Sequence, residues 1–147
     1  MIPTEETMRR LVGHRFPGGQ YTIEHWENFL LSEATGVEPL PDSLAHPVHL
    51  FHVPINGVGT SITELFALAE VDGSSPVSID YYDWSIHEPI REGETYSLSG
   101  GIAAYERKES DGRPTVDSFT YEIDVTGEGG DLAAHVAFRW HYWRIES

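Results

Sequence analysis

An aspartate and a histidine, Asp42 and His46, lie four residues apart beside a proline-containing stretch, and both residue types can transfer protons. A carboxylate next to a histidine fixes the tautomer of the ring and raises its basicity, so the two form the smallest acid/base unit. The spacing therefore predicts proton-transfer chemistry at this point of the chain. The alternative is that Asp42 only caps the segment that begins at His46 and Pro47.

Three histidines, His46, His49 and His52, follow one another at intervals of three residues. On an α-helix such a series spreads over about 300° of the helix surface, and on a strand it alternates between the two faces. Neither conformation brings three imidazoles to one ion. We therefore predict no metal site and no cofactor, and we expect these side chains to line a polar cavity or to face solvent.

The composition restricts the partners and the chemistry of the chain. Its 147 residues include 24 acidic and nine basic side chains, and the formal net charge of −15 disfavours nucleic acids and anionic membranes. The chain has no cysteine, which excludes disulfides and thiolate nucleophiles. It shows no signal-peptide pattern and no run of about 18 apolar residues. We expect a single domain over residues 1–147 and a cytoplasmic location.

Two segments have the spacing of an amphipathic helix. Between Glu24 and Gly36, a short apolar stripe is formed by Trp26, Phe29 and Leu30, and Gly36 suits a left-handed C-terminal position. The second segment belongs to a predicted core helix within 57–70, where a serine and a glutamate have the spacing of a capping box. Its buried stripe is expected to consist of Ile62, Leu65, Phe66 and Ala69, after the N-terminal pair Ser61 and Glu64.

The second half of the chain alternates between apolar and polar residues. Four period-two runs lie at 77–82, 96–102, 119–125 and 136–142, separated by short segments rich in glycine and acidic residues. Such runs are typical of an antiparallel sheet with one covered face. Because this sheet needs a cover, we predict an α+β fold in which the strands wrap around the core helix.

The order of these elements resembles the hotdog fold, an antiparallel sheet wrapped around a central helix. Four stretches resemble the MaoC-like and fungal fatty-acid-synthase-like dehydratase domains of that superfamily: VGHRF at 12–16, ATG at 34–36, AHP at 45–47 and HEPIREGETY at 87–96. The resemblance implies that an acyl thioester of coenzyme A or of an acyl carrier protein binds in a tunnel at a dimer interface. There a carboxylate and a histidine activate water.

The sequence departs from this family where the family has its carboxylate and histidine. The run Asp-x-Asn-Pro-Leu-His directly follows the glycine that ends the first helix in the family, whereas Gly36 is followed here by VEPLP at 37–41. The aspartate position falls on Val37 or Glu38, and the histidine position falls on Pro41. The usual pair is therefore absent from its usual place.

Nearby residues can replace the missing pair. We expect Asp42 and His46 to transfer protons, because they follow the departure directly. Asn56 and Gly57 stand where the family has a His-Gly pair before the core helix, so the Gly57 amide is a candidate donor to the thioester oxygen; alternatively, Gly57 only serves a turn. The predicted substrate contacts are Glu38, His52, Asn56 and Gly57.

Two classes of function follow from the resemblance. The first is an enoyl-thioester hydratase or 3-hydroxyacyl-thioester dehydratase. The second is a non-catalytic hotdog subunit that shapes the acyl tunnel of a catalytic partner, as a homodimer or a heterodimer. Thioester hydrolysis is a third possibility, but Glu64 lies too far into the core helix to act beside its N-terminus.

Overall fold

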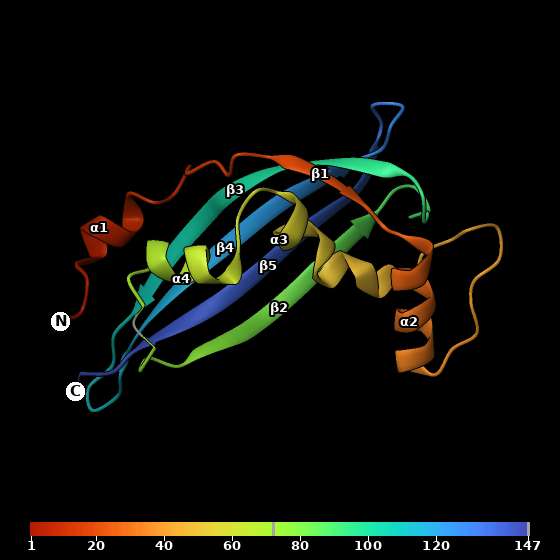
Figure 1. Cartoon of the computed structure of the whole chain (residues 1–147). Helices are drawn as coiled ribbons and strands as arrows, with labels where there is room; N and C mark the ends of the chain where they lie inside the picture. Colours follow the sequence, from red (N-terminus) through yellow and green to blue (C-terminus); the bar gives the residue numbers. More distant parts are fainter. Residues whose placement is uncertain (72, 147) are drawn as a thin grey trace.

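The computed structural model describes residues 1–71 and 73–146, which form a five-stranded antiparallel sheet and a layer of short helices (Figure 1). The strands are β1 (Gly19–Thr22), β2 (Val77–Ile86), β3 (Thr95–Lys108), β4 (Thr115–Thr126) and β5 (Leu132–Arg144). Their order in the sheet is β1-β3-β4-β5-β2. The helices are α1 (Glu5–Arg9), α2 (His25–Thr35), the 3₁₀ helix η1 (Pro47–Phe51), α3 (Val53–Gly57) and α4 (Ile62–Leu68).

The four long strands are the four period-two runs of the sequence, extended by a few residues. On β4, Phe119, Tyr121 and Ile123 are buried, whereas Glu122 is exposed on the other face. The buried face is closed by helices, because an apolar sheet surface must be covered. The predicted α+β architecture is confirmed.

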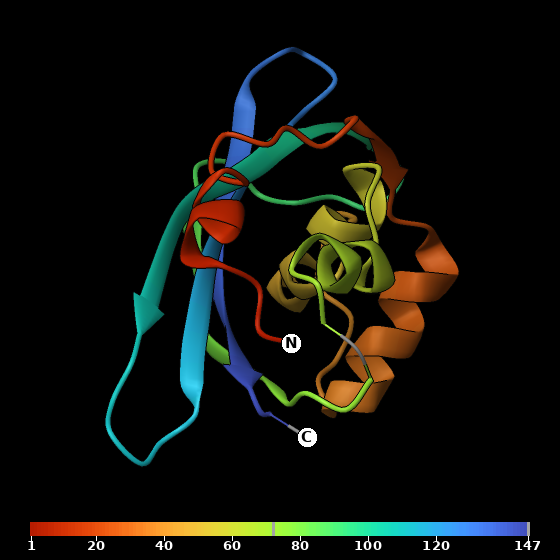
Figure 2. The same ribbon diagram turned by 90° about the vertical axis from the view of Figure 1, so that its left-hand side faces the viewer.

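Helices α3, α4 and α2 lie at two different distances from the sheet. In Figure 2, α3 and α4 pack on the concave face, and α2 lies beyond them on the side away from the strands. Leu65 and Ala69 of the α4 segment are fully buried, and the ring of Phe66 meets those of Trp140 and Tyr142 edge to face. None of the helices in the described ranges is long and apolar enough to span a membrane.

The predicted core helix is α4, and a separate short helix, α3, precedes it. Gly57 ends α3, and Gly59 follows with a left-handed φ of 82°, so the chain leaves the helical conformation before α4 begins. Ser61 then caps α4 by accepting a hydrogen bond from the Glu64 amide at 3.1 Å, as predicted. The predicted burial of Ile62 is wrong, since 52% of this residue is exposed.

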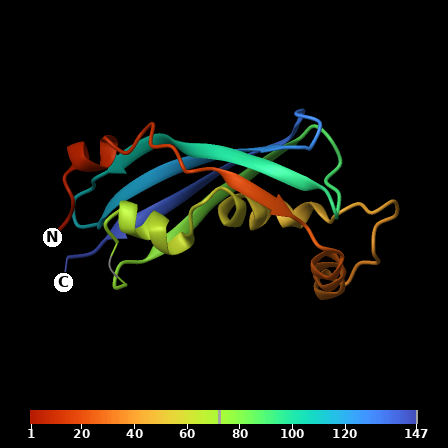
Figure 3. The same cartoon turned by 45° about the horizontal axis from the view of Figure 1, so that its top comes forward.

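Helix α2 turns the opposite face inward from the one that the sequence predicts. Trp26 and Leu30 are 63% and 56% exposed, and Phe29 is also exposed, whereas Asn28 and Ser32 are buried. The physical reason is position: α2 lies at the end of the molecule, clear of the apolar face of the sheet (Figure 3). It packs on polypeptide backbone, which requires hydrogen-bonding side chains.

Candidate functional site

A cavity of about 320 Å³ lies between α2 and the segment that runs from η1 into α3. Three polar side chains, Glu27, His49 and His52, line it and approach one another closely. The remaining lining is apolar and comes from α2, namely Trp26, Leu30, Leu31 and Ala34. The site thus combines titratable groups with a wall that suits an apolar ligand.

Asn28 fixes α2 over this cavity. Its side-chain amide donates to the Leu44 carbonyl at 3.0 Å and to Glu92 Oε2 at 2.8 Å, and its oxygen accepts from the His46 amide at 3.1 Å. Hydrogen bonds from Asn28 and His25 hold the pKa of Glu92 below its usual range. One buried amide therefore joins α2 to two loops, which positions the neighbouring Glu27.

Glu27 is oriented by two further contacts. The Tyr21 hydroxyl donates to Glu27 Oε2 at 2.7 Å, and the Glu24 amide donates to Oε1 at 3.4 Å within a capping box. Burial, together with this hydrogen bond, raises the pKa of Tyr21 to about 12, so the phenol stays protonated and remains a donor. A carboxylate has about four acceptor positions, so Glu27 keeps capacity for another ligand.

The 3₁₀ helix η1 aligns two histidines. A 3₁₀ helix has three residues per turn, so side chains three apart lie above one another. The rings of His49 and His52 are accordingly 5.2 Å apart between centroids. His46 precedes them as the N-cap, its Nδ1 accepting from the Val48 amide at 3.1 Å, and Pro47 occupies the first turn.

His49 is the most unusual member of this group. The residue is only 1% exposed, and neither ring nitrogen has a hydrogen-bond partner among the described residues. Burial lowers the pKa of His49 to about 4 and also lowers the pKa of His52. Both rings are neutral at pH 7, which leaves a nitrogen lone pair on each free to accept a proton or bind an ion.

Asp42 and His46, the predicted acid/base pair, are not joined by a hydrogen bond or an ion pair in residues 1–71 and 73–146. Asp42 is exposed with a left-handed φ of 58°, and its carbonyl accepts from Arg91 at 2.8 Å. The Nδ1 of His46 is used in capping η1. The side chain that caps η1 is therefore that of His46, so the alternative interpretation of Asp42 as the cap is wrong.

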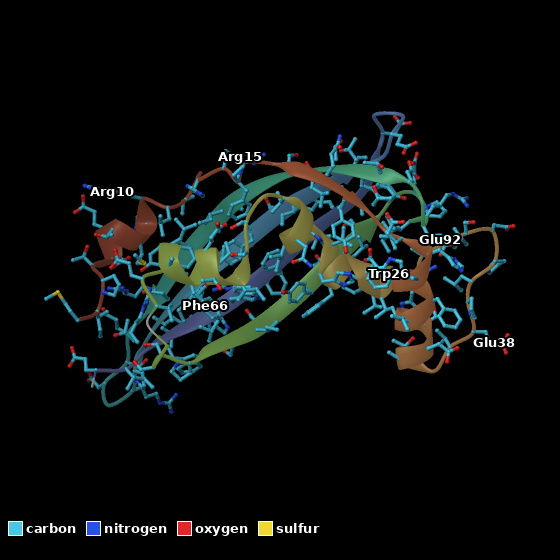
Figure 4. All side chains as sticks on the ribbon, viewed as in Figure 1. Arg10, Arg15, Trp26, Glu38, Phe66 and Glu92 are labelled. Carbon is cyan, nitrogen blue, oxygen red and sulfur yellow. The ribbon has the colours of Figure 1, made fainter. Side chains whose placement is uncertain are left out.

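The predicted substrate contacts are spread over three places. Glu38 is exposed on the loop after α2, away from Trp26 at the start of that helix (Figure 4). His52 lies in the cavity, and Asn56 is exposed one helical turn further along α3. Gly57 is buried at the end of α3, where a Cβ atom would come within 2.7 Å of Leu98 Cδ1. Close packing thus explains this glycine.

Glu27 was not among the residues predicted from the sequence, and His49 was predicted only as a polar lining residue. The interval of three residues behind Pro47 was the available signal, because proline favours the first turn of a helix. This interval indicates a shared site only if the segment is assumed to be a 3₁₀ helix, and not an α-helix or a strand. Nothing in the linear sequence places Glu27 opposite these histidines.

A larger groove of about 510 Å³ lies at the amino end of α4, between this helix and the segment before β1. Its lining is mostly apolar, with His14, Arg15 and Glu64 as the titratable members. These three are not among the side chains whose ligand atoms converge in the described part of the chain. The groove can hold an apolar chain, but the chemistry-bearing cluster lies between α2 and η1.

A second histidine contact lies on the outer face of the sheet. Ser118 Oγ and His141 Nδ1 are 2.6 Å apart, and His141 Nε2 is 3.5 Å from Asp80. These are the residue types of nucleophilic hydrolysis. However, Ser118 is only 3% exposed and faces its cross-strand partner, so the contact is explained as a link between β4 and β5.

Comparison with solved structures gives extensive matches at low sequence identity. The chain matches the ChsH1-ChsH2 complex from Mycobacterium tuberculosis with a TM-score of 0.73 and 13% identity, covering 97% of this chain and 92% of the matched chain. The chain has the hotdog fold. A structure described as a MaoC-like dehydratase matches with a TM-score of 0.68 and 13% identity over 93% of this chain and 43% of that one.

A structure described as a thioesterase is also similar to this chain. A probable thioesterase from Bartonella henselae matches with a TM-score of 0.57 and 7% identity, covering 89% of this chain and 92% of the other. No protein-family model and no curated protein matches the sequence. The predicted hotdog fold and the structural likeness to MaoC-like dehydratases are confirmed.

Proposed function

We propose that this hotdog protein is an acyl-thioester hydratase or dehydratase in which His52 transfers the proton and Glu27 stabilises the charged form of the ring. The observation that carries the proposal is the convergence of a carboxylate and two neutral imidazoles in a cavity with an apolar wall. The similarity to MaoC-like dehydratases supports this reaction class. The cluster supplies the acid/base groups that the family's usual positions lack in this sequence.

The chemistry of hydration assigns a role to each group. Neutral His52 takes a proton from water while the oxygen adds to the β-carbon of the enoyl thioester, and Glu27 stabilises the imidazolium that forms. Negative charge develops on the thioester oxygen, and the Asn56 side chain, one turn after His52 on the same side of α3, is the proposed donor to it. The His52 imidazolium then returns its proton to the α-carbon, which completes the addition and restores the neutral ring.

The test is hydration of crotonyl-coenzyme A by the purified chain, with Glu27→Gln and His52→Asn as variants. Each variant should lower kcat by about 10²–10⁴-fold, the usual contribution of a positioned acid or base. Glu33→Gln, an exposed change on the same helix, should leave the rate within about twofold. Full activity in Glu27→Gln and His52→Asn would refute the assignment.

The pair predicted from the sequence, Asp42 and His46, is tested in the same assay. If His46→Ala abolishes hydration while Glu27→Gln does not, the protons pass through the loop rather than the cavity. The carrier, coenzyme A or a carrier protein, is compared by supplying the same crotonyl group on each.

A second candidate function is that of a non-catalytic subunit of a hotdog heterodimer. Apolar side chains are exposed on α2 and on the edge strand β2, namely Trp26, Phe29, Leu30, Ile79, Tyr81 and Ile86. Exposed apolar patches mark interaction surfaces, and an unpaired edge strand favours pairing. The match to a complex of two proteins supports this alternative. It predicts that the chain alone is inactive but raises hydration by a hotdog partner that has the usual Asp-His pair.

A further inference from the structure

Glu27, His49 and His52 present one ligand atom each, and these atoms all lie within 4.8 Å of one another. Two imidazoles and one carboxylate are a ligand set of catalytic zinc sites and of iron(II) sites with open positions. Bond lengths of about 2.0–2.2 Å place such ligand atoms about 3.3 Å apart, which small side-chain rotations can reach from here.

The ligand set is assembled from two sides of the cavity. Three residues per turn of η1 place His49 and His52 together, and α2 supplies Glu27 from the opposite wall. This removes the geometric objection raised by the sequence, which assumed an α-helix or a strand. Only two of the three histidines take part, since His46 is committed to its capping bond.

The state of His49 gives an independent reason to expect a ligand. A buried polar group without a partner costs about 1–3 kcal/mol, so native structures rarely keep one without a role. Both ring nitrogens of His49 are in this condition within the described residues, in a ring that lines the cavity. A bound ion would use one lone pair that the protein leaves unused.

The surroundings of Glu27 also fit coordination. Metal-binding carboxylates are usually held by outer hydrogen bonds that fix their orientation. Tyr21 provides such a bond at 2.7 Å, and its phenol stays protonated. Among the described residues, no lysine or arginine lines the cavity to repel a cation.

We propose that Glu27, His49 and His52 bind one divalent transition-metal ion, with open coordination positions facing the cavity. Zn²⁺ is the probe of choice because it accepts this ligand set with three protein ligands. The proposal goes beyond the hydratase assignment, and the two compete: coordination occupies the lone pairs that proton transfer needs. Metal binding is therefore expected to inhibit hydration, and chelation to restore it.

The experiment is calorimetric titration of the EDTA-treated, dialysed protein with ZnCl₂, supported by the visible spectrum of the Co²⁺ form. We expect one ion per chain and a melting temperature that rises with Zn²⁺ concentration. Glu27→Gln and His49→Leu should each weaken the affinity about 100-fold or more, and Tyr21→Phe about tenfold through the lost outer hydrogen bond. His87→Asn, which changes an exposed histidine, should leave the affinity within twofold.

The strongly acidic surface makes nonspecific binding the main competing explanation. Unchanged stoichiometry and affinity in both Glu27→Gln and His49→Leu would place the ion on that surface and overturn the proposal. So would the absence of Zn²⁺ binding by the folded wild-type protein. Because binding is measured without substrate, failure of the metal site is distinguished from failure of the hydratase assignment.

Discussion

Two clusters of buried polar residues occupy opposite ends of this molecule, and they use burial differently. At the end near the chain termini, Asp117 is fully buried on β4 and accepts hydrogen bonds from Arg107 at 2.7 and 2.9 Å, from Arg144 at 2.7 Å and from Tyr105 at 2.6 Å. Arg107 also donates to the Pro3 carbonyl, which ties the N-terminal segment to the sheet. This cluster is satisfied.

At the α2 end, the cluster of Glu27, His49 and His52 includes one ring, that of His49, whose two nitrogens have no hydrogen-bond partner within residues 1–71 and 73–146. Both clusters bury ionisable side chains at a cost. In the Asp117 cluster the cost is offset by hydrogen bonds within the protein, whereas around His49 it is not. The difference supports the proposal that the Glu27, His49 and His52 cluster binds a ligand, whereas the Asp117 cluster maintains the fold.

The largest effect expected from this comparison follows removal of Asp117. Asp117→Ala leaves two buried guanidinium groups without their counter-ion, so the free energy of unfolding should fall by about 3–5 kcal/mol. Urea denaturation monitored by tryptophan fluorescence measures it. Asp111→Ala, in the exposed turn between β3 and β4, is the control and should change stability by about 0.5 kcal/mol or less. If Asp117→Ala lowers the free energy of unfolding by less than about 1 kcal/mol, the Asp117 cluster does not stabilise the fold and the proposed difference between the two clusters is wrong.

The opposite sign is expected in the other cluster. His49→Leu replaces an unsatisfied buried ring with an apolar side chain of similar size, so in EDTA the free energy of unfolding should stay constant or rise by about 1 kcal/mol. His46→Leu in the same helix removes a capping acceptor and should cost about 1 kcal/mol. If His49→Leu instead destabilises the metal-free protein by more than about 2 kcal/mol, His49 has a structural partner and the comparison fails.

The smallest effect concerns acid stability. Burial favours the neutral form of Asp117, but the hydrogen bonds from Arg107, Tyr105 and Arg144 outweigh it and hold its pKa below the usual value of 3.8. The stability this group contributes is therefore present above pH 3.8 and is lost as the pH falls toward the folded-state pKa, at a slope of at most about 1.4 kcal/mol per pH unit.

Unfolding curves between pH 5 and pH 2.5 check this slope against Asp117→Asn, which has no such titration. The two proteins should converge in stability as the pH falls. Parallel curves would show that Asp117 does not titrate below its usual range.

The sheet was the most predictable part of the structure. Alternation at Phe119, Tyr121 and Ile123 reports burial directly, since a strand exposes successive residues to opposite faces. The end of α2 at Gly36 and the cap at Ser61 were predicted equally well, because they depend on local backbone geometry. The candidate site was predicted only in part, through His52 as a substrate contact and His49 as a polar lining residue.

The predictions that failed depend on contacts between distant segments. The stripe of Trp26, Phe29 and Leu30 has the spacing of a buried face, but Asn28 takes that place through bonds to residues 16 and 64 positions away. A pattern within one helix cannot indicate whether its neighbour is a sheet or a loop.

By itself, the sequence determined the local features of this protein: its strands, its helix ends, its acidic surface and the hotdog order of its elements. These are set by interactions within a few residues of the chain, which periodicity records. Only the tertiary structure decided that η1 is a 3₁₀ helix facing α2, and hence that Glu27 meets His49 and His52. That convergence depends on how α2 packs against η1, and the order of residues along the chain does not indicate the distance between these two helices.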